Sequence, residues 1–587
     1  MTEPTRARVS PRVAAVLAAC AFVVGVVLRT IEYLRDRPLW LDEAMLSLNI
    51  ASRSFAELAR PLDYDQTAPL LYLWLERAIV LLGGVNERSL RLLPFLAGVA
   101  LIPAMWFVGR RVAGTTAASV ATLLVALSVT LVAFGAEAKQ YAVDPLATLV
   151  VLWLACRAID APGERGKWVQ LAVGGVICLL VSQPAVFALG GAVIALALHG
   201  GVKRSAPGRN WVIASAVAWA VTFSVVYVAL YRGTATSDYM QRFWEGTFLD
   251  LRAGDFLLRL RMFAHAAFAA PLLAGQGYGF VALTVCAWAV GVWMLWGRDR
   301  VRATLVAAPL VLATGASVLG LYPVMDRLYL FAAPVVLLGL SVLVRVASEQ
   351  STTRWRHPVF AALALFVAAV TAEAHVERVT APVFHGVGKQ VVADVDSMSR
   401  GDAVYVAARS FPLWIYYTTD WKSPDRERLA WAASIGGAGK AAHNNAPPRG
   451  HPVEAAEAVA LARPYRGRTE IVGLPTGRQY RTSTRTLDAT LTPAQYALPL
   501  TPDSAWSAVE VGRMAAVARP KIWVFGSHMF ALDGAEPGLV ADLQRRGVRL
   551  LMERRQGSTV AYHVEFPVGA DGMVAERTSQ VNGRVDP

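Results

Sequence analysis

Residues 13–31 read VAAVLAACAFVVGVVLRTI, an apolar run with a single charge near its end. A helix of about 20 such residues is long enough to cross the hydrocarbon core of a bilayer. Three basic residues precede the run: Arg6, Arg8 and Arg12. A cleaved signal peptide is one interpretation of this pattern. We favour an uncleaved first span, because Arg29, Glu32 and Tyr33 follow where a small-residue cleavage site would stand.

Ten further apolar runs follow before the composition changes near residue 373. They cover residues 90–108, 116–134, 145–159, 168–182, 184–199, 211–231, 278–296, 303–320, 328–344 and 357–373. The chain is 55% hydrophobic and only 17% charged, whereas a soluble protein is roughly 25% charged. The sequence therefore predicts a mainly α, polytopic membrane domain over residues 1–372, with about 11 transmembrane helices. Residues 373–587 read as a soluble α/β domain.

The net charge of +14 would suggest a nucleic-acid partner in a soluble protein. Here the basic residues lie in short loops between alternate spans, where they favour the cytoplasmic side. The loops hold Arg110 and Arg111; Arg157, Arg165 and Lys167; Lys203, Arg204 and Arg209; Arg298, Arg300 and Arg302; and Arg345, Arg354 and Arg356. This pattern argues against nucleic acid and predicts a multi-pass plasma (inner) membrane protein. Its N-terminus would lie inside and its C-terminal domain outside, in the periplasmic or extracytoplasmic space.

Two apolar segments do not fit this alternation. Residues 69–84 carry Glu76 and Arg77 near their middle. A central charge in lipid costs about 2.5–3.5 kcal/mol on insertion scales. We therefore expect an amphipathic helix at the outer surface here. The same interpretation applies to residues 256–272.

The four cysteines predict no metal or disulfide chemistry. Cys20, Cys156, Cys178 and Cys286 all lie inside apolar segments, without CxxC spacing. Small buried packing residues are the simplest interpretation. Any metal would have to be a hard cation held by carboxylates. We expect neither a metal nor another cofactor to be required.

The first outside loop, residues 32–89, is far longer than a helical hairpin needs, and long loops are often functional. It contains PLWLDE at residues 38–43 and DYDQTAPLLY at residues 63–72. Asp42 stands among apolar neighbours, a setting that can raise the pKa of a carboxyl and make it a general base. The alternative is an N-cap for a helix over Glu43–Ala51. Both interpretations stay open.

Two further outside patches are dense in polar residues. The second loop reads FGAEAKQYAVDP over residues 134–145. Its polar side chains include Glu137, Lys139, Tyr141 and Asp144. A third patch runs from Tyr322 to Arg327, where the arginine could hold a lipid phosphate through charge-assisted hydrogen bonds. Anchoring at the membrane interface is the alternative for both patches.

These three patches, in this order on one face, resemble the GT-C superfamily of membrane glycosyltransferases. The similarity is greatest to the branch of protein O-mannosyltransferases and lipid A aminoarabinose transferases, and it covers about residues 10–345. The matching segments are Asp42-Glu43, Asp65 to Tyr72, Asn86 to Pro94, Gly109 to Arg111, Lys139 to Asp144, and Tyr322-Pro323 with Arg327. The chain departs from the pattern at Ala68-Pro69, where many members have His or Lys before two prolines. Mannosyltransferases have Arg where this chain has Lys139.

The resemblance implies an inverting glycosyltransferase that moves a sugar from a polyprenyl-phosphate carrier to an extracytoplasmic acceptor. The acceptor would be a lipid, glycan or protein hydroxyl. By resemblance, Asp42 and Glu43 form the catalytic motif, with Asp42 as the general base. Arg327, Tyr322 and Lys139 would bind the donor phosphate. The residues expected to position the acceptor or sugar are Glu137, Asp144, Tyr141 and Asp65.

Two other functions fit a polytopic membrane protein. A transporter or flippase of a lipid-linked substrate often shows internal repeats and charges at mid-membrane. This chain shows no repeat, and its charges cluster at span ends. A non-catalytic scaffold that binds glycolipids is the second alternative.

The C-terminal domain alternates short strands with helices. Residues 403–408 and 521–525 read as buried strands, and residues 411–418 and 537–546 as helices. Segments 548–553 and 559–565 predict a hairpin. The tail after Pro567 is expected to be disordered.

Overall fold

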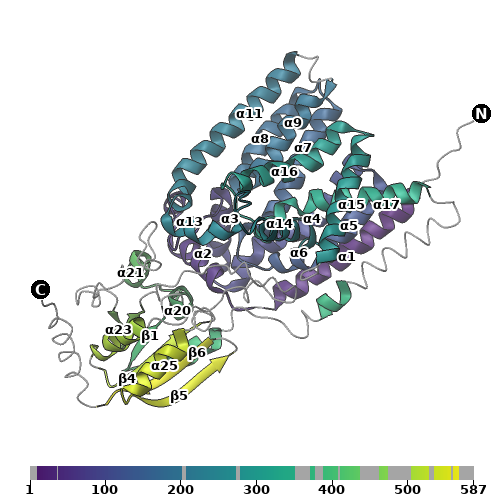
Figure 1. The fold of residues 1–587 in the computed structure, drawn as a ribbon. Helices are drawn as coiled ribbons and strands as arrows, with labels where there is room; N and C mark the ends of the chain where they lie inside the picture. The colour runs from purple at the N-terminus through teal and green to yellow at the C-terminus, as the bar shows by residue number, and fades with distance from the viewer. Residues whose placement is uncertain are drawn as a thin grey trace, which may run out of the picture.

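The computed structural model shows a helical body and a smaller unit built around a β-sheet (Figure 1). It describes residues 10–35, 37–200, 206–272, 278–350, 371–376, 388–407, 410–435, 462–473, 504–517, 519–527, 535–556 and 559–567. The predicted tail after Pro567 and most of the predicted span 357–373 lie outside these residues. The predicted class, an α-helical membrane protein with a C-terminal α/β domain, is confirmed.

The first ten apolar runs all form helices. The corresponding elements are α1 (Pro11–Leu34), α4 (Glu87–Val112), α5 (Thr115–Leu127) with α6 (Val129–Phe134), α7 (Val143–Asp160), α8 (Arg165–Val181), α9 (Ala185–Leu198), α11 (Ala206–Val226) with η3 (Tyr227–Tyr231), α15 (Tyr278–Trp296), α16 (Arg300–Val318), and η6 (Leu330–Ala332) with α17 (Ala333–Gln350). Among the described residues, 6 helical stretches are long and apolar enough to cross a membrane. The total number of crossings stays a prediction.

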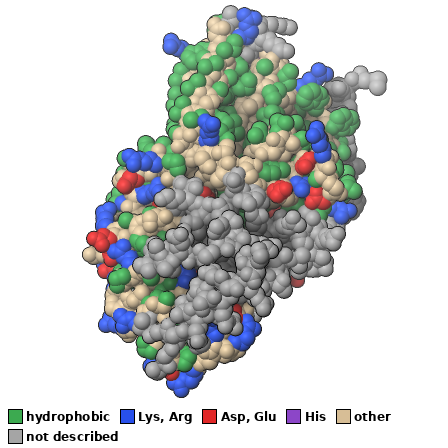
Figure 2. Space-filling model, turned by 60° about the vertical axis from the view of Figure 1, so that its left-hand side comes forward, with side chains coloured by type: hydrophobic (Ala, Val, Ile, Leu, Met, Phe, Trp, Pro, Cys, Tyr) green, Lys and Arg blue, Asp and Glu red, His purple; other side chains and the backbone are tan. Residues whose placement is uncertain are grey.

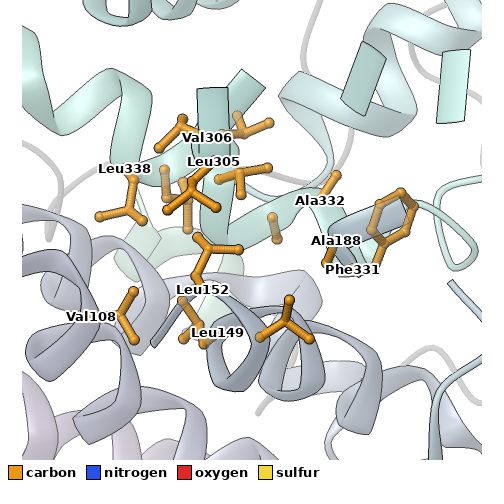
Figure 3. Close-up of a cluster of buried hydrophobic side chains, with 14 of the residues drawn as sticks. Val108, Leu149, Leu152, Ala188, Leu305, Val306, Phe331, Ala332 and Leu338 are labelled. Carbon is orange, nitrogen blue, oxygen red and sulfur yellow. The ribbon is translucent and has the colours of Figure 1, made fainter. Parts of the chain in front are cut away.

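The centre of the helical body is apolar. Side chains from α4, α7, α9, α16, α17 and η6 meet there, and Val108, Leu152, Leu305 and Phe331 are among them (Figure 3). On the face drawn in Figure 2, hydrophobic side chains cover much of the helical body. This distribution suits helices that are surrounded by lipid rather than by water.

Helix α1 packs closely against α4 and α5. A Cβ at Gly25 would lie 2.7 Å from Ile102 and 2.9 Å from Ala126, so only glycine allows this approach. Four residues along, the buried Arg29 donates to the carbonyl of Val125 at 2.9 Å and to that of Ala126 at 3.1 Å. These carbonyls lie in the last turn of α5, where no helical donor follows. The charge near the end of the first span therefore has a structural partner.

The first outside loop folds into α2 (Leu41–Ser52), η1 (Glu57–Ala59) and α3 (Leu70–Gly83). Helix α3 starts directly after Pro69 and stops at Gly84, whose φ of 78° favours glycine. The helix predicted over residues 69–84 is confirmed, but Glu76 is fully buried rather than exposed at a surface. Burial raises the pKa of Glu76 well above its usual range, which favours the neutral acid.

The outer loops and the segments between later spans add several short elements. They are η2 (Gln140–Ala142), α12 (Arg232–Ala235), α13 (Asp238–Trp244), η4 (Glu245–Thr247), α14 (Phe256–Ala264) and η5 (His265–Ala269). The helix expected over residues 256–272 thus forms as α14 followed by η5. Its position at the membrane surface stays a prediction.

The C-terminal unit is a six-stranded mixed sheet with the order β2-β3-β1-β4-β6-β5. The strands are β1 (Ala403–Val406), β2 (Ala462–Tyr465), β3 (Arg468–Val472), β4 (Lys521–Gly526), β5 (Arg549–Gln556) and β6 (Thr559–Glu565). Strand β1 runs parallel to β3 and β4, and the other pairs are antiparallel. The expected hairpin is present as β5 and β6.

Five described helices accompany the sheet. They are α19 (Lys389–Met398), α20 (Phe411–Thr418), α21 (Arg426–Ile435), α23 (Ser504–Ala515) and α25 (Ala535–Arg545). Helices α20 and α21 lie between the sheet and the helical body, next to α2 (Figure 1). The α/β unit is therefore attached to the end of the body that carries the first outside loop.

Candidate active site

Asp42 is the second residue of α2 and lies in its first turn. The N-cap is Trp40, whose backbone N–H donates to Glu43 Oε2 at 3.1 Å. The interpretation of Asp42 as the N-cap is therefore wrong, because the helix begins earlier than expected.

Two cations from distant parts of the chain converge on Asp42. Its Oδ1 lies 3.1 Å from Nζ of Lys139, and its Oδ2 lies 3.1 Å from Nη1 of Arg327. The side chains of Asp42 and Arg327 keep 20% and 19% of their exposure, and that of Lys139 keeps 4%. The three predicted outside patches thus meet at one partly open cluster, which we call the Asp42 cluster.

The expectation of a raised pKa for Asp42 is wrong in this conformation. Burial raises the pKa of Asp42, but the charges of Lys139 and Arg327 outweigh burial, so the pKa lies below its usual value. Sequence neighbours alone suggested an apolar setting; the two cations come from the second loop and the third patch. Asp42 is therefore ionised at neutral pH.

Gln66 completes the immediate surroundings of Lys139. Its Oε1 accepts a hydrogen bond of 2.6 Å from Nζ of Lys139. Just before it, Tyr64 and Asp65 adopt left-handed backbone conformations with φ of 63° and 52°, which a non-glycine residue adopts only at some cost. This strained turn brings Gln66 to the cluster. Asp65 itself lies in this turn, next to Gln66 in the chain.

Glu43 lies on the inner side of α2 and is almost completely buried. Its carboxylate pairs with Arg91 of α4 at 2.8 Å and accepts the backbone N–H of Ala138 at 2.7 Å. These two contacts, with the bond from the N–H of Trp40, tie α2 to α4 and to the second loop. The structure thus places Glu43 in a buried ion pair behind Asp42.

Arg327 is enclosed by aromatic rings. Its guanidinium carbon lies 5.7 Å from the ring centre of Trp40 and 5.8 Å from that of Tyr141. Such cation–π contacts hold an arginine over an aromatic face. Burial lowers the pKa of Arg327, but the nearby tyrosine and carboxylates outweigh it and raise the pKa above its usual value. Arg327 therefore stays charged.

Tyr322 supports the loop that carries Arg327. Its hydroxyl donates to the carbonyl of Leu328 at 2.6 Å, so its proton is engaged inside the loop. Next to Arg327, Asp326 pairs with Nδ1 of His265 at 3.3 Å. No sequence motif singled out this histidine, which links η5 to the loop.

Several buried polar atoms around the second loop lack a hydrogen-bond partner among the described residues. They are Trp40 Nε1, Glu137 Oε2, Gln140 Oε1, Asp144 Oδ1 and Arg327 Nε. Buried polar atoms are paired in the great majority of cases. These atoms are available to form hydrogen bonds with a polar ligand.

Glu137 and Asp144 each contribute one of these oxygen atoms. Burial, and then the negative charge of Glu43, raise the pKa of Glu137 to about 7. Asp144 is in the first turn of α7, with 3% of its surface exposed. In the described part of the chain, neither acid forms an ion pair with Lys139 or Arg327.

No group of three or more His, Cys, Asp or Glu side chains that could hold a metal ion occurs in the described ranges of the chain. The cluster combines one carboxylate with two cations and one amide. Such a set of groups can bind an anion and move a proton.

A family model described as "Dolichyl-phosphate-mannose-protein mannosyltransferase" matches residues 67–229. The matched region runs from the start of α3 into η3 and includes the second outside loop with Lys139. The predicted resemblance to GT-C membrane glycosyltransferases is confirmed. Asp42, Tyr322 and Arg327 lie outside the matched residues, so their roles depend on the geometry described above.

Similar solved structures include two membrane glycosyltransferases of low sequence identity. ArnT from Cupriavidus metallidurans, bound to undecaprenyl phosphate, is 15% identical; the alignment covers 73% of this chain and 88% of ArnT, with a TM-score of 0.44. The oligosaccharyltransferase of Archaeoglobus fulgidus in its apo form is 13% identical, with coverages of 90% and 71% and a TM-score of 0.48. No curated protein sequence matches the chain.

Proposed function

We propose that this glycosyltransferase moves a sugar from a polyprenyl-phosphate carrier to an acceptor hydroxyl on the outer face of the membrane. The observation that carries the proposal is the position of Asp42 between Lys139 and Arg327, with one cation at 3.1 Å from each carboxylate oxygen. The family match supports the donor class, since the family description names a lipid phosphate carrier.

The two cations form the site for the donor phosphate. Hydrogen bonds between a phosphate and Arg or Lys are charge-assisted and strong. Both cations already hold a carboxylate, so an incoming phosphate would exchange with Asp42 as their anionic partner. The aromatic rings of Trp40 and Tyr141 keep Arg327 in place during this exchange.

The exchange prepares Asp42 to act as the general base. Lys139 and Arg327 hold the pKa of Asp42 low, so engagement of their charges by phosphate raises that pKa. A base is most effective when its pKa approaches the working pH. Donor binding would therefore make Asp42 a better base at the moment when it is needed.

The reaction is a direct displacement at the anomeric carbon of the sugar. The acceptor oxygen forms a bond to this carbon while the bond from the carbon to the phosphate oxygen breaks. The acceptor proton passes to Asp42, and the electron pair of the broken bond leaves with polyprenyl phosphate. Lys139 and Arg327 stabilise the charge on the leaving phosphate. One displacement inverts the configuration.

The other predicted residues take supporting roles. Glu137, Asp144 and Tyr141 border the group of unpartnered buried atoms and position the acceptor or the sugar. Glu43 anchors α2 through its contacts with Arg91 of α4 and with the backbone of Ala138. The basic loops at the other ends of the spans support a location of the Asp42 cluster outside the cell.

The test compares Asp42→Asn with Asp63→Asn in cells that lack the native gene. Asp63 is an acid of the same loop that pairs with Arg53 at 2.9 Å, away from the cluster. Loss of a general base typically lowers the rate by about 10²–10⁴-fold. Asp42→Asn should therefore leave the lipid-linked sugar at the level of the deletion strain, as measured by mass spectrometry of lipid extracts. Asp63→Asn should restore its consumption.

The release of polyprenyl phosphate separates this proposal from the other candidate functions. A flippase or a scaffold consumes no donor, so purified protein with extracted lipid-linked sugar and cell-envelope acceptor would release no polyprenyl phosphate. Full donor consumption by Asp42→Asn, at a protein level equal to wild type, would contradict the role of Asp42.

A further inference from the structure

We infer that the C-terminal α/β domain positions the first outside loop, residues 32–89, which we call the active-site loop. Tyr417 is the residue through which the domain holds the start of α2. The inference rests on the proposed function, because it assigns to this domain a role in the same reaction. It begins from the backbone of residues 37–40, the short segment that leads into α2.

Side chains hold four of the backbone groups of this segment. Arg91 of α4 donates to the carbonyl of Arg37 at 2.5 Å and to that of Pro38 at 3.2 Å. The N–H of Leu39 donates to the hydroxyl oxygen of Tyr417 at 2.6 Å. The helical body thus fixes the carbonyls of the segment, whereas the C-terminal domain fixes an N–H. Asp42 follows three residues after Leu39.

A second hydrogen bond joins the other half of the loop to the same domain. The hydroxyl of Tyr64 donates to the carbonyl of Ala432 in α21 at 3.1 Å. Tyr64 opens the left-handed turn, and Gln66, two residues later, accepts the bond from Lys139. Both links from the domain therefore reach the loop within three residues of a member of the Asp42 cluster.

The two links are embedded in one continuous apolar cluster. Leu39, Ala44 and Leu46 of the loop region belong to the same buried cluster as Phe411 and Trp414 of α20, and each of these side chains is fully buried. Helices α2 and α20 lie against each other, as Figure 1 shows. A shared core resists sliding, because separation would expose apolar surface on both sides.

An ion pair extends the contact beside Tyr417. Nζ of Lys389 in α19 lies 2.8 Å from Oε1 of Glu87, the first residue of α4, and 5.9 Å from the ring centre of Tyr417. Glu87 precedes Arg91 by one helical turn. The domain thus contacts the segment 37–40 directly, and it also contacts α4, which holds that segment through Arg91.

Tyr417 is a positioning residue: its hydroxyl contacts the backbone of the loop and not the reacting groups. Loss of one neutral hydrogen bond of about 0.5–1.5 kcal/mol corresponds to a roughly two- to tenfold change. The binding of the lipid phosphate depends on Lys139 and Arg327, so it should change much less than turnover. A domain that only stabilised the fold would not separate these two quantities.

The experiment compares Tyr417→Phe with Tyr465→Phe in the full-length protein. Tyr465 belongs to the same domain, and its hydroxyl donates to the carbonyl of Thr418, the last residue of α20, at 3.3 Å. The control therefore removes a hydroxyl from the same region without touching the loop. The measurements are amide hydrogen exchange of residues 37–44, affinity for undecaprenyl phosphate, and donor consumption in cells.

In Tyr417→Phe, we expect the backbone amide hydrogen of Leu39 to exchange faster than in wild type. We expect this variant to consume donor roughly two- to tenfold more slowly. Its affinity for undecaprenyl phosphate should stay within about twofold of wild type, and Tyr465→Phe should behave like wild type in all three measurements. Equal effects of the two substitutions, or unchanged exchange at Leu39 in Tyr417→Phe, would overturn the inference. Asp42→Asn is included as a reference: if that variant stays active, the proposed function itself fails.

Discussion

At the scale of single residues, the site combines a carboxylate that is kept ionised with one that is kept near its titration point. Lys139 and Arg327 lower the pKa of Asp42, whereas burial raises that of Glu137 to about 7. The two carboxyl groups share the same end of the helical body but differ in their distance from cations. Environment, rather than residue type, separates the two roles.

Glu137 should make the stability of the protein depend on pH. Its pKa is higher in the folded state than in the unfolded state, so the folded protein binds more protons between about pH 4.5 and pH 7. The contribution of Glu137 to stability is therefore lost as the pH rises through this window. Between pH 5 and pH 7, the thermal midpoint of wild type should fall relative to that of Glu137→Gln. Parallel curves for the two proteins would show that Glu137 does not titrate there.

The sequence identified most of this site but not its electrostatics. Asp42, Lys139 and Arg327 were each visible as charges at predicted outside span ends, so the topology alone favoured their meeting. The low pKa of Asp42 was missed, because Arg327 approaches it across 285 positions of the chain. Gln66 gave no signal, since an amide in a loop resembles any other polar loop residue.

At the scale of elements, Glu43 joins three segments behind the active site. Its carboxylate binds Arg91 of α4, the N–H of Ala138 in the second loop and the N–H of Trp40 at the start of α2. A buried ion pair adds little net stability, but removal of one partner is costly, because it leaves the other charge unpaired.

Glu43→Gln should therefore destabilise the protein by about 3–5 kcal/mol and lower sugar transfer as α2 loosens. Glu57→Gln is the matched control, because Glu57 lies in the same loop and bonds Ser54 at the surface. Its effect should stay within about 0.5 kcal/mol. Thermal unfolding of the two purified variants measures the difference. An unchanged midpoint for Glu43→Gln would show that the buried pair does not hold the elements together.

The helices were predictable because their apolar runs are long, whereas their exact starts were not. The start of α2 was placed two residues too late: Trp40 caps the helix through its backbone, and no Ser, Thr or Asp marks the position. Glu76 in α3 was expected at a surface. It is buried because α2, α4 and α8 all pack against α3, a tertiary effect that local periodicity does not contain.

At the scale of the whole molecule, the first outside loop lies between the helical body and the α/β domain. Strands β2 and β3 of that domain were not predicted, whereas β1, β4 and the hairpin of β5 and β6 were predictable from short β-rich runs. Its docking was not, because the contact between Leu39 and Tyr417 spans 378 positions and depends on a tyrosine without a sequence motif.

The proposed orientation of the molecule predicts which surfaces reagents can reach from outside the cell. In a background with the four native cysteines replaced by serine, Lys422→Cys places a thiol on the exposed surface of the α/β domain. Glu164→Cys places one in a predicted inner loop, where the side chain of Glu164 is 64% exposed. A membrane-impermeant maleimide should label Lys422→Cys in intact cells and Glu164→Cys only after lysis. The reverse pattern would place the Asp42 cluster inside the cell.

The most direct test of the account measures lipid binding and sugar transfer in the same Asp42→Asn preparation. Removal of the carboxylate frees Lys139 and Arg327 from their present partner, so this variant should bind undecaprenyl phosphate at least as tightly as wild type. It should nevertheless lose about 10²–10⁴-fold of its transfer rate. Arg327→Ala serves as the opposite case and should weaken binding. Loss of undecaprenyl phosphate binding in Asp42→Asn, or transfer at the wild-type rate, would contradict the division of roles within the Asp42 cluster.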